Sequence, residues 1–233
     1  MNFEQMNNNK VYIAGKVISK PEFSYEVFGE GFYEFNLEVK RLSDTSDIIP
    51  VTISERLLKE QEILVGSMIA GNGQFRSYNK VVEDKSKLML TVFIRELVPY
   101  NENENPNQIE LTGFVCKKPI YRTTPFKREI TDVLIAVNRS YNKSDYLPCI
   151  AWGRNAKFVK SLNVGDKLNM VGRIQSRVYQ KKIGDQILEK VAFEISLSKV
   201  SKLENDAVLN LSPFIETQQN YYANLNWPFI LAF

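Results

Sequence analysis

The side chains that most enzymes use for catalysis are scarce in this sequence. Its 233 residues include no histidine, which removes Ser–His and Cys–His nucleophile pairs, histidine metal ligands and histidine general bases. Two isolated cysteines, Cys116 and Cys149, cannot form a tetrathiolate zinc site. No Asp/Glu cluster points to carboxylate catalysis with or without a hard metal. The sequence therefore predicts a protein that is not an enzyme and has no metal or other cofactor.

Basic side chains gather in one half of the chain. The formal net charge of the whole chain is only +3. Residues 9–100 hold 12 Lys/Arg and 13 Asp/Glu, whereas residues 107–203 hold 18 Lys/Arg and 8 Asp/Glu, a net charge of +10. Clustered basic charge is the electrostatic pattern expected of a protein with a polyanionic ligand.

The elements that must position these groups come from an internal repeat. The segment Asn9–Pro21 (NKVYIAGKVISKP) matches Asn107–Pro119 (NQIELTGFVCKKP) at an offset of 98 residues, with Asn, Gly, Lys and Pro in common. Two further stretches match almost in the same register, FNLEVKR with VLIAVNR (35–41 and 133–139) and GQFRS with GRIQS (73–77 and 172–176). So many matches in register indicate two homologous domains.

The repeat sets the expected domain boundaries. We expect a flexible N-terminus at 1–8, a first domain at 9–100, a linker at 101–106, a second domain at 107–203 and a C-terminal tail at 204–233. Each domain alternates apolar and polar residues in short stretches bounded by Gly, Pro, Asn or Asp, which predicts half-buried antiparallel strands. One short helix is expected at Asn155–Leu162. This order favours a small five-stranded Greek-key barrel, although topology alone leaves another small barrel or sandwich open.

The sequence also bears on the cellular compartment in which the protein is expected. No run approaches the ~20 apolar residues of a membrane helix, and the Asn-rich segment Met1–Lys10 lacks the apolar core of a secretory signal. Cys116 and Cys149 each lie in an apolar strand-like run, where a small buried thiol is usual. We therefore expect a reducing cytoplasm and no disulfide.

Three motifs of the second domain occur in a fixed order. They are Pro148–Arg154 (PCIAWGR), Val164–Asp166 (VGD) and Met170–Tyr179 (MVGRIQSRVY). In this order they resemble the bacterial single-stranded DNA-binding protein family, in which an aromatic-Gly-basic turn precedes a helix, a turn and a Gly-Arg-containing strand that ends in an aromatic residue. The resemblance covers the second domain well and the first more weakly. It implies an all-β fold with short helices, built as two tandem five-stranded Greek-key OB-fold barrels.

The resemblance also implies a site. Three aromatic positions of the family stack on bases, and matched residue by residue they fall on Tyr146, Trp152 and Tyr179. Such a platform tolerates any sequence because every base has a π-face. Four arginines on or beside the same strands could pair with phosphates or stack: Arg139, Arg154, Arg173 and Arg177. Lys181 and Lys182, at an expected hairpin tip, would clamp the backbone.

These residues have structural interpretations as well. Trp152 could be a core residue, although its position at a strand end favours the binding role. Tyr146 and Tyr179 could equally pack, and Lys181 and Lys182 could form a solvated turn. Two acids that match in the repeat, Asp47 and Asp145, are predicted to form turns.

The first domain departs from the family pattern. In place of the three aromatic residues it has Ile48, Ser54 and Lys80. Three residues near these positions are candidates for weaker contacts: Phe75, Arg76 and Tyr78. We therefore expect the first domain to serve packing or dimerisation and the second to carry most of the affinity, so that Trp152→Ala would weaken binding far more than Phe75→Ala.

The implied partner is single-stranded DNA, with no membrane involved, and the stacking chemistry accepts RNA as well. The family works with four OB folds around one strand, which implies a homodimer of this chain. The expected function is sequence-independent binding in DNA replication, recombination or repair, in the cytoplasm at the nucleoid. The alternative is a primosome-type or recombination accessory protein that acts mainly through contacts with replication or repair proteins. An enzyme that carries OB folds is disfavoured by the missing histidines.

The C-terminal tail differs from that of the family, whose acidic tip with Pro-Phe recruits other proteins. Here Pro228-Phe229 is internal, and no acid follows Glu216. An apolar end that packs on its own domain or on a dimer partner, and a peptide that docks another protein, are both open interpretations.

Overall fold

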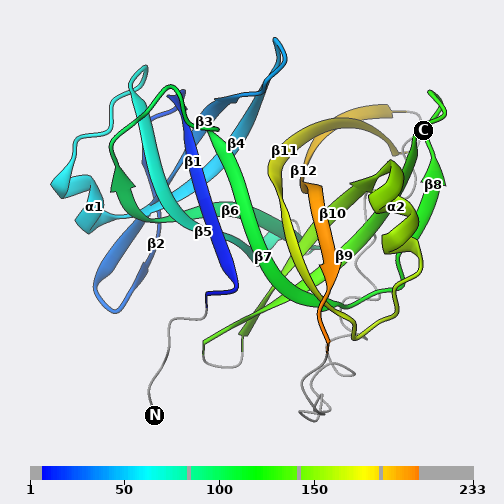
Figure 1. Ribbon diagram of the computed structural model, residues 1–233. Helices are drawn as coiled ribbons and strands as arrows, with labels where there is room; N and C mark the ends of the chain where they lie inside the picture. Colours follow the sequence, from blue (N-terminus) through cyan, green and yellow to red (C-terminus); the bar gives the residue numbers. More distant parts are fainter. Residues whose placement is uncertain (1–6, 83–84, 141–142, 184–185, 205–233) are drawn as a thin grey trace.

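The computed structural model describes residues 7–82, 85–140, 143–183 and 186–204 (Figure 1). Most of the predicted N-terminal segment lies outside the described residues, and so does the tail from residue 205 onwards with its Pro228-Phe229 pair. The described chain forms two similar units of strands, each with one short helix.

The first unit is a closed barrel. Its strands are β1 (Asn9–Val17), β2 (Glu22–Val27), β3 (Glu30–Lys40), β4 (Ser46–Ser54), β5 (Met68–Val82) and β6 (Lys85–Val98), and its helix is α1 (Glu55–Glu60). Five strands pair in the cycle β1–β3–β4–β6–β5–β1, in which β4 and β6 are parallel and the other pairs antiparallel. The remaining strand, β2, extends the sheet beyond β3.

The second unit repeats this cycle. Its elements are β7 (Asn107–Val115), β8 (Ile120–Thr123), β9 (Glu129–Arg139), β10 (Lys143–Trp152), α2 (Gly153–Lys160), β11 (Lys167–Ile183) and β12 (Gln186–Lys202). The cycle β7–β9–β10–β12–β11–β7 closes through the parallel pair β10–β12. The expectation of two tandem five-stranded barrels is therefore confirmed, with one additional short strand at the edge of each.

The elements follow from the alternation in the sequence. In β1, Val11 and Ile13 are buried and the intervening residue is not, because successive side chains of a strand point to opposite faces. The predicted helix exists but begins and ends two residues earlier than expected, as Gly153–Lys160. It buries Ala156 and Val159 against the second barrel. The sequence reasoning did not foresee α1.

The repeated glycines mark places where two strands approach closely. A Cβ atom at Gly113 would lie 2.6 Å from Cγ2 of Ile135, and one at Gly172 would lie 2.4 Å from the carbonyl oxygen of Ser196. Neither position has room for a side chain, so glycine is required where β7 crosses β9 and where β11 bulges against β12.

The two units meet through an antiparallel pairing of β1 with β7, which joins both barrels into one strand order (Figure 1). Val11 lies opposite Ile109, its own counterpart in the repeat, so the junction has approximate two-fold symmetry. The symmetry extends to two asparagines. Asn9 clamps the backbone of Phe75 with bonds of 2.8 and 3.0 Å, and Asn107 clamps Ile174 in the same way with bonds of 2.6 and 2.8 Å.

Asp47 and Asp145 correct the sequence interpretation, because they are not turn residues. Asp47 of β4 is fully buried and accepts a 2.7 Å hydrogen bond from the backbone N–H of Ser176 in the other unit. Asp145 of β10 is also buried and accepts a 2.8 Å bond from the N–H of Ser77 in the first unit. Each acid thus reaches across the junction to the same position of the opposite β-ribbon, and the two contacts together lock the units.

No helix in the described part of the chain is long and apolar enough to cross a membrane.

Candidate nucleic-acid interface

The second unit carries a groove of about 1090 Å³ along β11. Five arginines and three aromatic residues line it: Arg41, Arg122, Arg128, Arg173, Arg177, Phe126, Trp152 and Tyr179. Four of these, Trp152, Tyr179, Arg173 and Arg177, are among the site residues predicted from the sequence. The groove therefore brings two predicted base-stacking residues and two predicted phosphate-binding residues to one surface.

Trp152 lies at the point where β10 ends and α2 begins. Its side chain is 37% exposed, and its Nε1–H donates a 3.2 Å hydrogen bond to Oγ of Ser196 on β12. The next residue, Gly153, has a φ of 53°, which a residue with a side chain rarely adopts. The chain turns sharply there, so the indole ring is held at the groove and is not drawn into the core.

Tyr179 and Arg177 lie on the same face of β11. The Arg177 guanidinium is 6.0 Å from the centroid of the Tyr179 ring. Arg177 also lies 3.7 Å from the carboxylate of Glu194, which accepts a 2.7 Å bond from Gln175. Burial raises the pKa of Glu194, although Arg177 and Gln175 oppose this. The acid beneath the groove therefore holds Arg177 in place beside the tyrosine.

The first unit contributes Arg41 to this groove. Arg41 donates two bonds, of 2.7 and 2.6 Å, to the Asp47 carboxylate, and a third of 3.2 Å to the carbonyl oxygen of Ser176. Arg173 approaches the same carboxylate at 3.3 Å. Burial alone would raise the pKa of Asp47, but the bonds from Arg41 and Ser176 lower it below its usual value. The acid is therefore ionised at neutral pH and fixes two groove arginines.

Four of these eight arginines and aromatic residues were not predicted from the sequence: Arg41, Arg122, Arg128 and Phe126. Arg41 matches Arg139 in the repeat, and Arg139 was a predicted site residue, so the repeat could have identified Arg41 as a candidate. The other three lie on or beside the β8–β9 hairpin and carry no motif. Arg122 is held by Asp132 at 2.6 Å, whereas Phe126 is almost wholly exposed at the hairpin turn.

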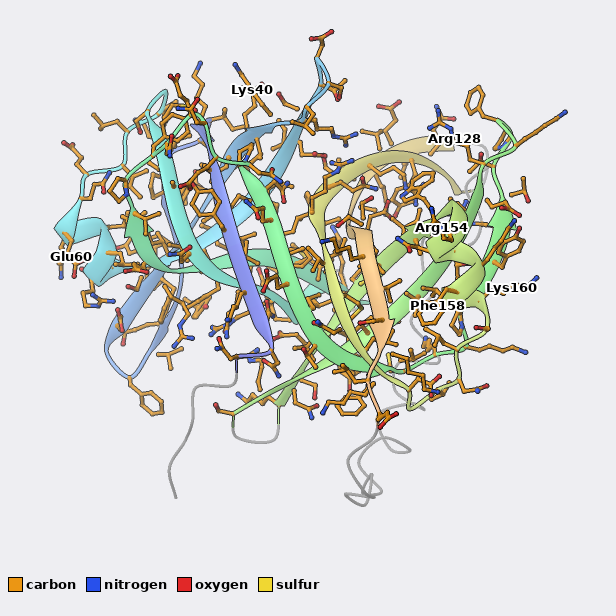
Figure 2. All side chains as sticks on the ribbon, in the orientation of Figure 1. Lys40, Glu60, Arg128, Arg154, Phe158 and Lys160 are labelled. Atoms are coloured by element: carbon orange, nitrogen blue, oxygen red, sulfur yellow. The ribbon has the colours of Figure 1, made fainter. Side chains whose placement is uncertain are left out.

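Three other predicted residues, Arg154, Tyr146 and Arg139, do not line the groove. Arg154 is exposed on α2, where Figure 2 shows it on the same helix as Phe158 and Lys160. Tyr146 is half-buried on β10, and its backbone N–H donates a 2.7 Å bond to Oγ of Ser77 at the junction. Arg139 pairs with Asp145 at 3.2 Å and lines a second, smaller cavity. Lys181 and Lys182 belong by their backbone to the β11–β12 ribbon, while their side chains and the hairpin tip at Gly184 lie outside the described residues.

The prediction for Phe75 is wrong. Its side chain is 0% exposed and forms part of the first barrel's core, so it cannot reach a base. Arg76 and Tyr78 point to the opposite face of β5, as alternation requires. Arg76 lies over the Phe93 ring at 3.7 Å, and the Tyr78 hydroxyl donates a 3.0 Å bond to Glu34.

Aromatic side chains fill the corresponding face of the first unit. By strand register, Phe93 takes the place of Ser196, and Phe32 the place of Ile130, which lies opposite Trp152. The rings of Phe32 and Phe93 are 5.6 Å apart, and Tyr25 stacks on Phe32 at 5.0 Å. The counterparts of Phe32 and Phe93 in the second unit, Ile130 and Ser196, line the groove.

Within the described ranges, no three His, Cys, Asp or Glu side chains lie where they could hold a metal ion together. Cys116 and Cys149 are both free thiols.

Comparison with known proteins places the second unit in one family. A model described as the single-strand binding protein family matches residues 106–203. Single-stranded DNA-binding protein 1 of Staphylococcus aureus (strain COL) is 32% identical over 88 residues, which cover 35% of this chain and 53% of that protein. Single-stranded DNA-binding protein B of Bacillus subtilis (strain 168) is 32% identical over 85 residues, which cover 34% of this chain and 75% of that protein. This chain thus spans about half the length of the S. aureus relative and a larger share of the B. subtilis one.

A solved structure resembles both units together. The wild-type single-stranded DNA binding protein from Thermus aquaticus superposes with a TM-score of 0.65 over 87% of this chain and 96% of that one, at 19% sequence identity. At this identity the likeness shows the fold, and it confirms the tandem OB-fold arrangement.

Proposed function

The chain belongs to the single-strand binding protein family, and on that premise we propose that it binds single-stranded DNA without sequence preference through the groove of its second unit. The open groove supports this above all. Trp152 and Tyr179 offer π-faces on which bases of any kind can stack, at about 1–3 kcal/mol per base. Five arginines along the same groove supply charge and planar donors for phosphates.

The second unit carries most of the affinity in this proposal. Its net charge of +10 contrasts with the near-neutral first unit. In the first unit, the larger Phe32 and Phe93 stand at the positions of the groove-lining Ile130 and Ser196, which leaves a strand less room there. The first unit still acts on the groove, because it supplies Arg41.

We further propose a homodimer with four barrels that acts in replication, recombination or repair, in the cytoplasm at the nucleoid, without catalytic turnover. The strand order ends at β2 in one unit and at β8 in the other, and such edges favour pairing with a further chain. Light scattering coupled to size exclusion tests the dimer against the chain mass of 26.9 kDa. The family does not favour an accessory protein that acts mainly through protein contacts.

Fluorescence titration tests DNA binding directly. The Trp227→Phe variant leaves Trp152 as the single fluorophore of its kind, since the chain has two tryptophans. Oligo-dT should quench this fluorescence, duplex DNA should not, and added salt should weaken the complex because phosphate contacts release counterions. Oligo-rU titrated in parallel measures the preference between DNA and RNA. If neither single strand quenches the signal nor forms a retained complex, the proposed function is wrong.

Trp152→Ala tests the groove itself. Loss of one stacking platform should weaken the affinity for labelled oligo-dT, measured by anisotropy, by about 5- to 150-fold, the equivalent of ~1–3 kcal/mol. Phe158→Ala is the matched control, since Phe158 is also 37% exposed and lies on the adjoining helix outside the groove. Equal losses in both variants would place the strand elsewhere.

A further inference from the structure

A second cavity, of about 300 Å³, lies at the junction of the two units. Gln74 and Arg76 of β5 and Arg95 of β6 line it from the first unit. Arg139 and Lys143 line it from the second unit, next to Asp145. Four cationic side chains therefore face one cavity that is open to solvent, and they come from both barrels.

The positive charge of this cavity is only partly balanced. Asp145 is the one carboxylate among the described lining residues; it is buried and already accepts bonds from the Ser77 N–H at 2.8 Å and from Arg139 at 3.2 Å. Burial raises the pKa of Asp145, with the Ser77 N–H and Arg139 acting in the opposite sense. Neither Arg95 nor Lys143 has an ion-pair partner among the described side chains. About three positive charges thus remain without a counter-charge in the lining.

Arg76 shows the effect of this crowding. Burial and, after it, the nearby charge of Arg139 lower the pKa of Arg76 to about 10, although Asp145 acts in the opposite sense. Two N–H groups of Arg76 donate to Oε1 of Gln74 at 3.3 and 2.9 Å, which fixes the orientation of the guanidinium. Its face is held against the Phe93 ring at 3.7 Å. A bound anion would relieve the repulsion between the two arginines, because they are fixed too firmly to move apart.

At the equivalent place on the other side of the junction, the positive charges are neutralised differently. There Asp47 binds Arg41 through two bonds of 2.6 and 2.7 Å and Arg173 through one of 3.3 Å. The two arginines converge on the protein's own carboxylate there. In the smaller cavity, by contrast, Arg95 and Lys143 are exposed at the rim and free to meet a ligand from solution.

We propose that the junction cavity binds a phosphate group, and that this phosphate belongs to a nucleic-acid strand. That the phosphate comes from a nucleic-acid strand rests on the proposed function, whereas the presence of an anion site is argued from the residues of the cavity alone. Arg95 and Lys143 contact the phosphate from the rim, and Arg76 and Arg139 contact it from below.

The double variant Arg95→Gln/Lys143→Gln tests the site and leaves the Asp145 contacts in place. For single strands, each phosphate contact contributes about 0.7 to the slope of log affinity against log salt concentration. Because the cavity binds one phosphate, the slope for labelled oligo-dT should be smaller by about 0.7 in the double variant. Arg56→Gln/Lys59→Gln is the matched control, because it removes the same charge from the exposed helix α1 and should leave the slope unchanged.

A second experiment distinguishes the binding of a phosphate within a strand from the binding of a free phosphate ion or nucleotide. Thermal unfolding is followed with inorganic phosphate, and separately with thymidine monophosphate, against sodium chloride at matched ionic strength. A change in the salt slope without stabilisation by the free ligands supports a site for strand phosphates. Stabilisation that the double variant loses supports the anion site even if the wild-type chain fails to bind DNA. The proposal is overturned if the double variant matches the control in both arms.

Discussion

The carboxylate of Asp47 is the contact on which the junction of the two units most depends. It is 0% exposed and receives hydrogen bonds from Arg41, Arg173 and the backbone of Ser176, so replacing it by alanine removes the acceptor of every one of them. Two arginines would then lie beside a buried space without a counter-charge. Breaking a buried ion pair by removing one partner costs about 3–5 kcal/mol, and we expect Asp47→Ala to lie in that range.

Asp145→Ala should cost less, although Asp145 occupies the equivalent position. It accepts one arginine bond of 3.2 Å and the Ser77 N–H bond, and its Oδ2 is buried without a hydrogen-bond partner. The raised pKa of Asp145 also indicates that its charge is poorly stabilised, chiefly because of burial. We expect a loss of about 1–3 kcal/mol, the cost of leaving a buried donor unsatisfied.

Urea unfolding followed by far-UV circular dichroism measures both losses. Asp44→Ala is the control, since Asp44 is an exposed acid three residues before Asp47 and its removal should change stability by less than about 0.5 kcal/mol. A loss below about 1 kcal/mol for Asp47→Ala, or equal losses for the two junction acids, would refute the view that the Asp47 contacts dominate the junction.

Three further outcomes are expected. The pKa of Asp47 is lower in the folded protein than in the unfolded chain, so its ionised carboxylate stabilises the fold above the unfolded pKa of ~4. This stabilisation is lost as the pH falls through the folded-state pKa. Asp47→Asn should therefore flatten the acid side of a plot of Tm against pH. Gly172→Ala should lower the unfolding free energy by about 1–3 kcal/mol and shift the Trp152 emission, because the new Cβ would press on Ser196, the hydrogen-bond partner of the indole. Burial raises the pKa of Cys116 to about 12 and raises that of Cys149 as well, so Ellman's reagent at pH ~8 should find both thiols unreactive until urea is added.

Alternation along β5 limits what could be predicted for its side chains. Phe75 and Arg76 are neighbours in a strand, so they must point to opposite faces and cannot both contact a ligand on one side. The sequence alone could not say which of them faces the core. The closed barrel decides this, because it places Phe75 among the core residues and leaves Arg76 outside.

The aromatic residues of the first unit show a second limit of sequence reasoning. Comparison of single positions found no aromatic residue where the second unit has Trp152. In the structure, Phe32 pairs directly with Ser54, the counterpart of Trp152, and its ring lies 5.6 Å from that of Phe93 on another strand. A position-by-position match cannot detect this, since side chains from three strands converge on one face only after the barrel has closed.

Two like units, strands as their building elements and a surplus of positive charge in the second unit could all be predicted from the amino-acid sequence. These properties follow from local alternation and from a repeat at a fixed offset, which need no knowledge of distant contacts. The contact of Asp47 with Ser176, 129 residues away, and the place of Arg41 from the first unit in the groove of the second could be learned only from the folded chain. The reason is the two-fold pairing of β1 with β7, which brings equivalent but separate parts of the repeat face to face.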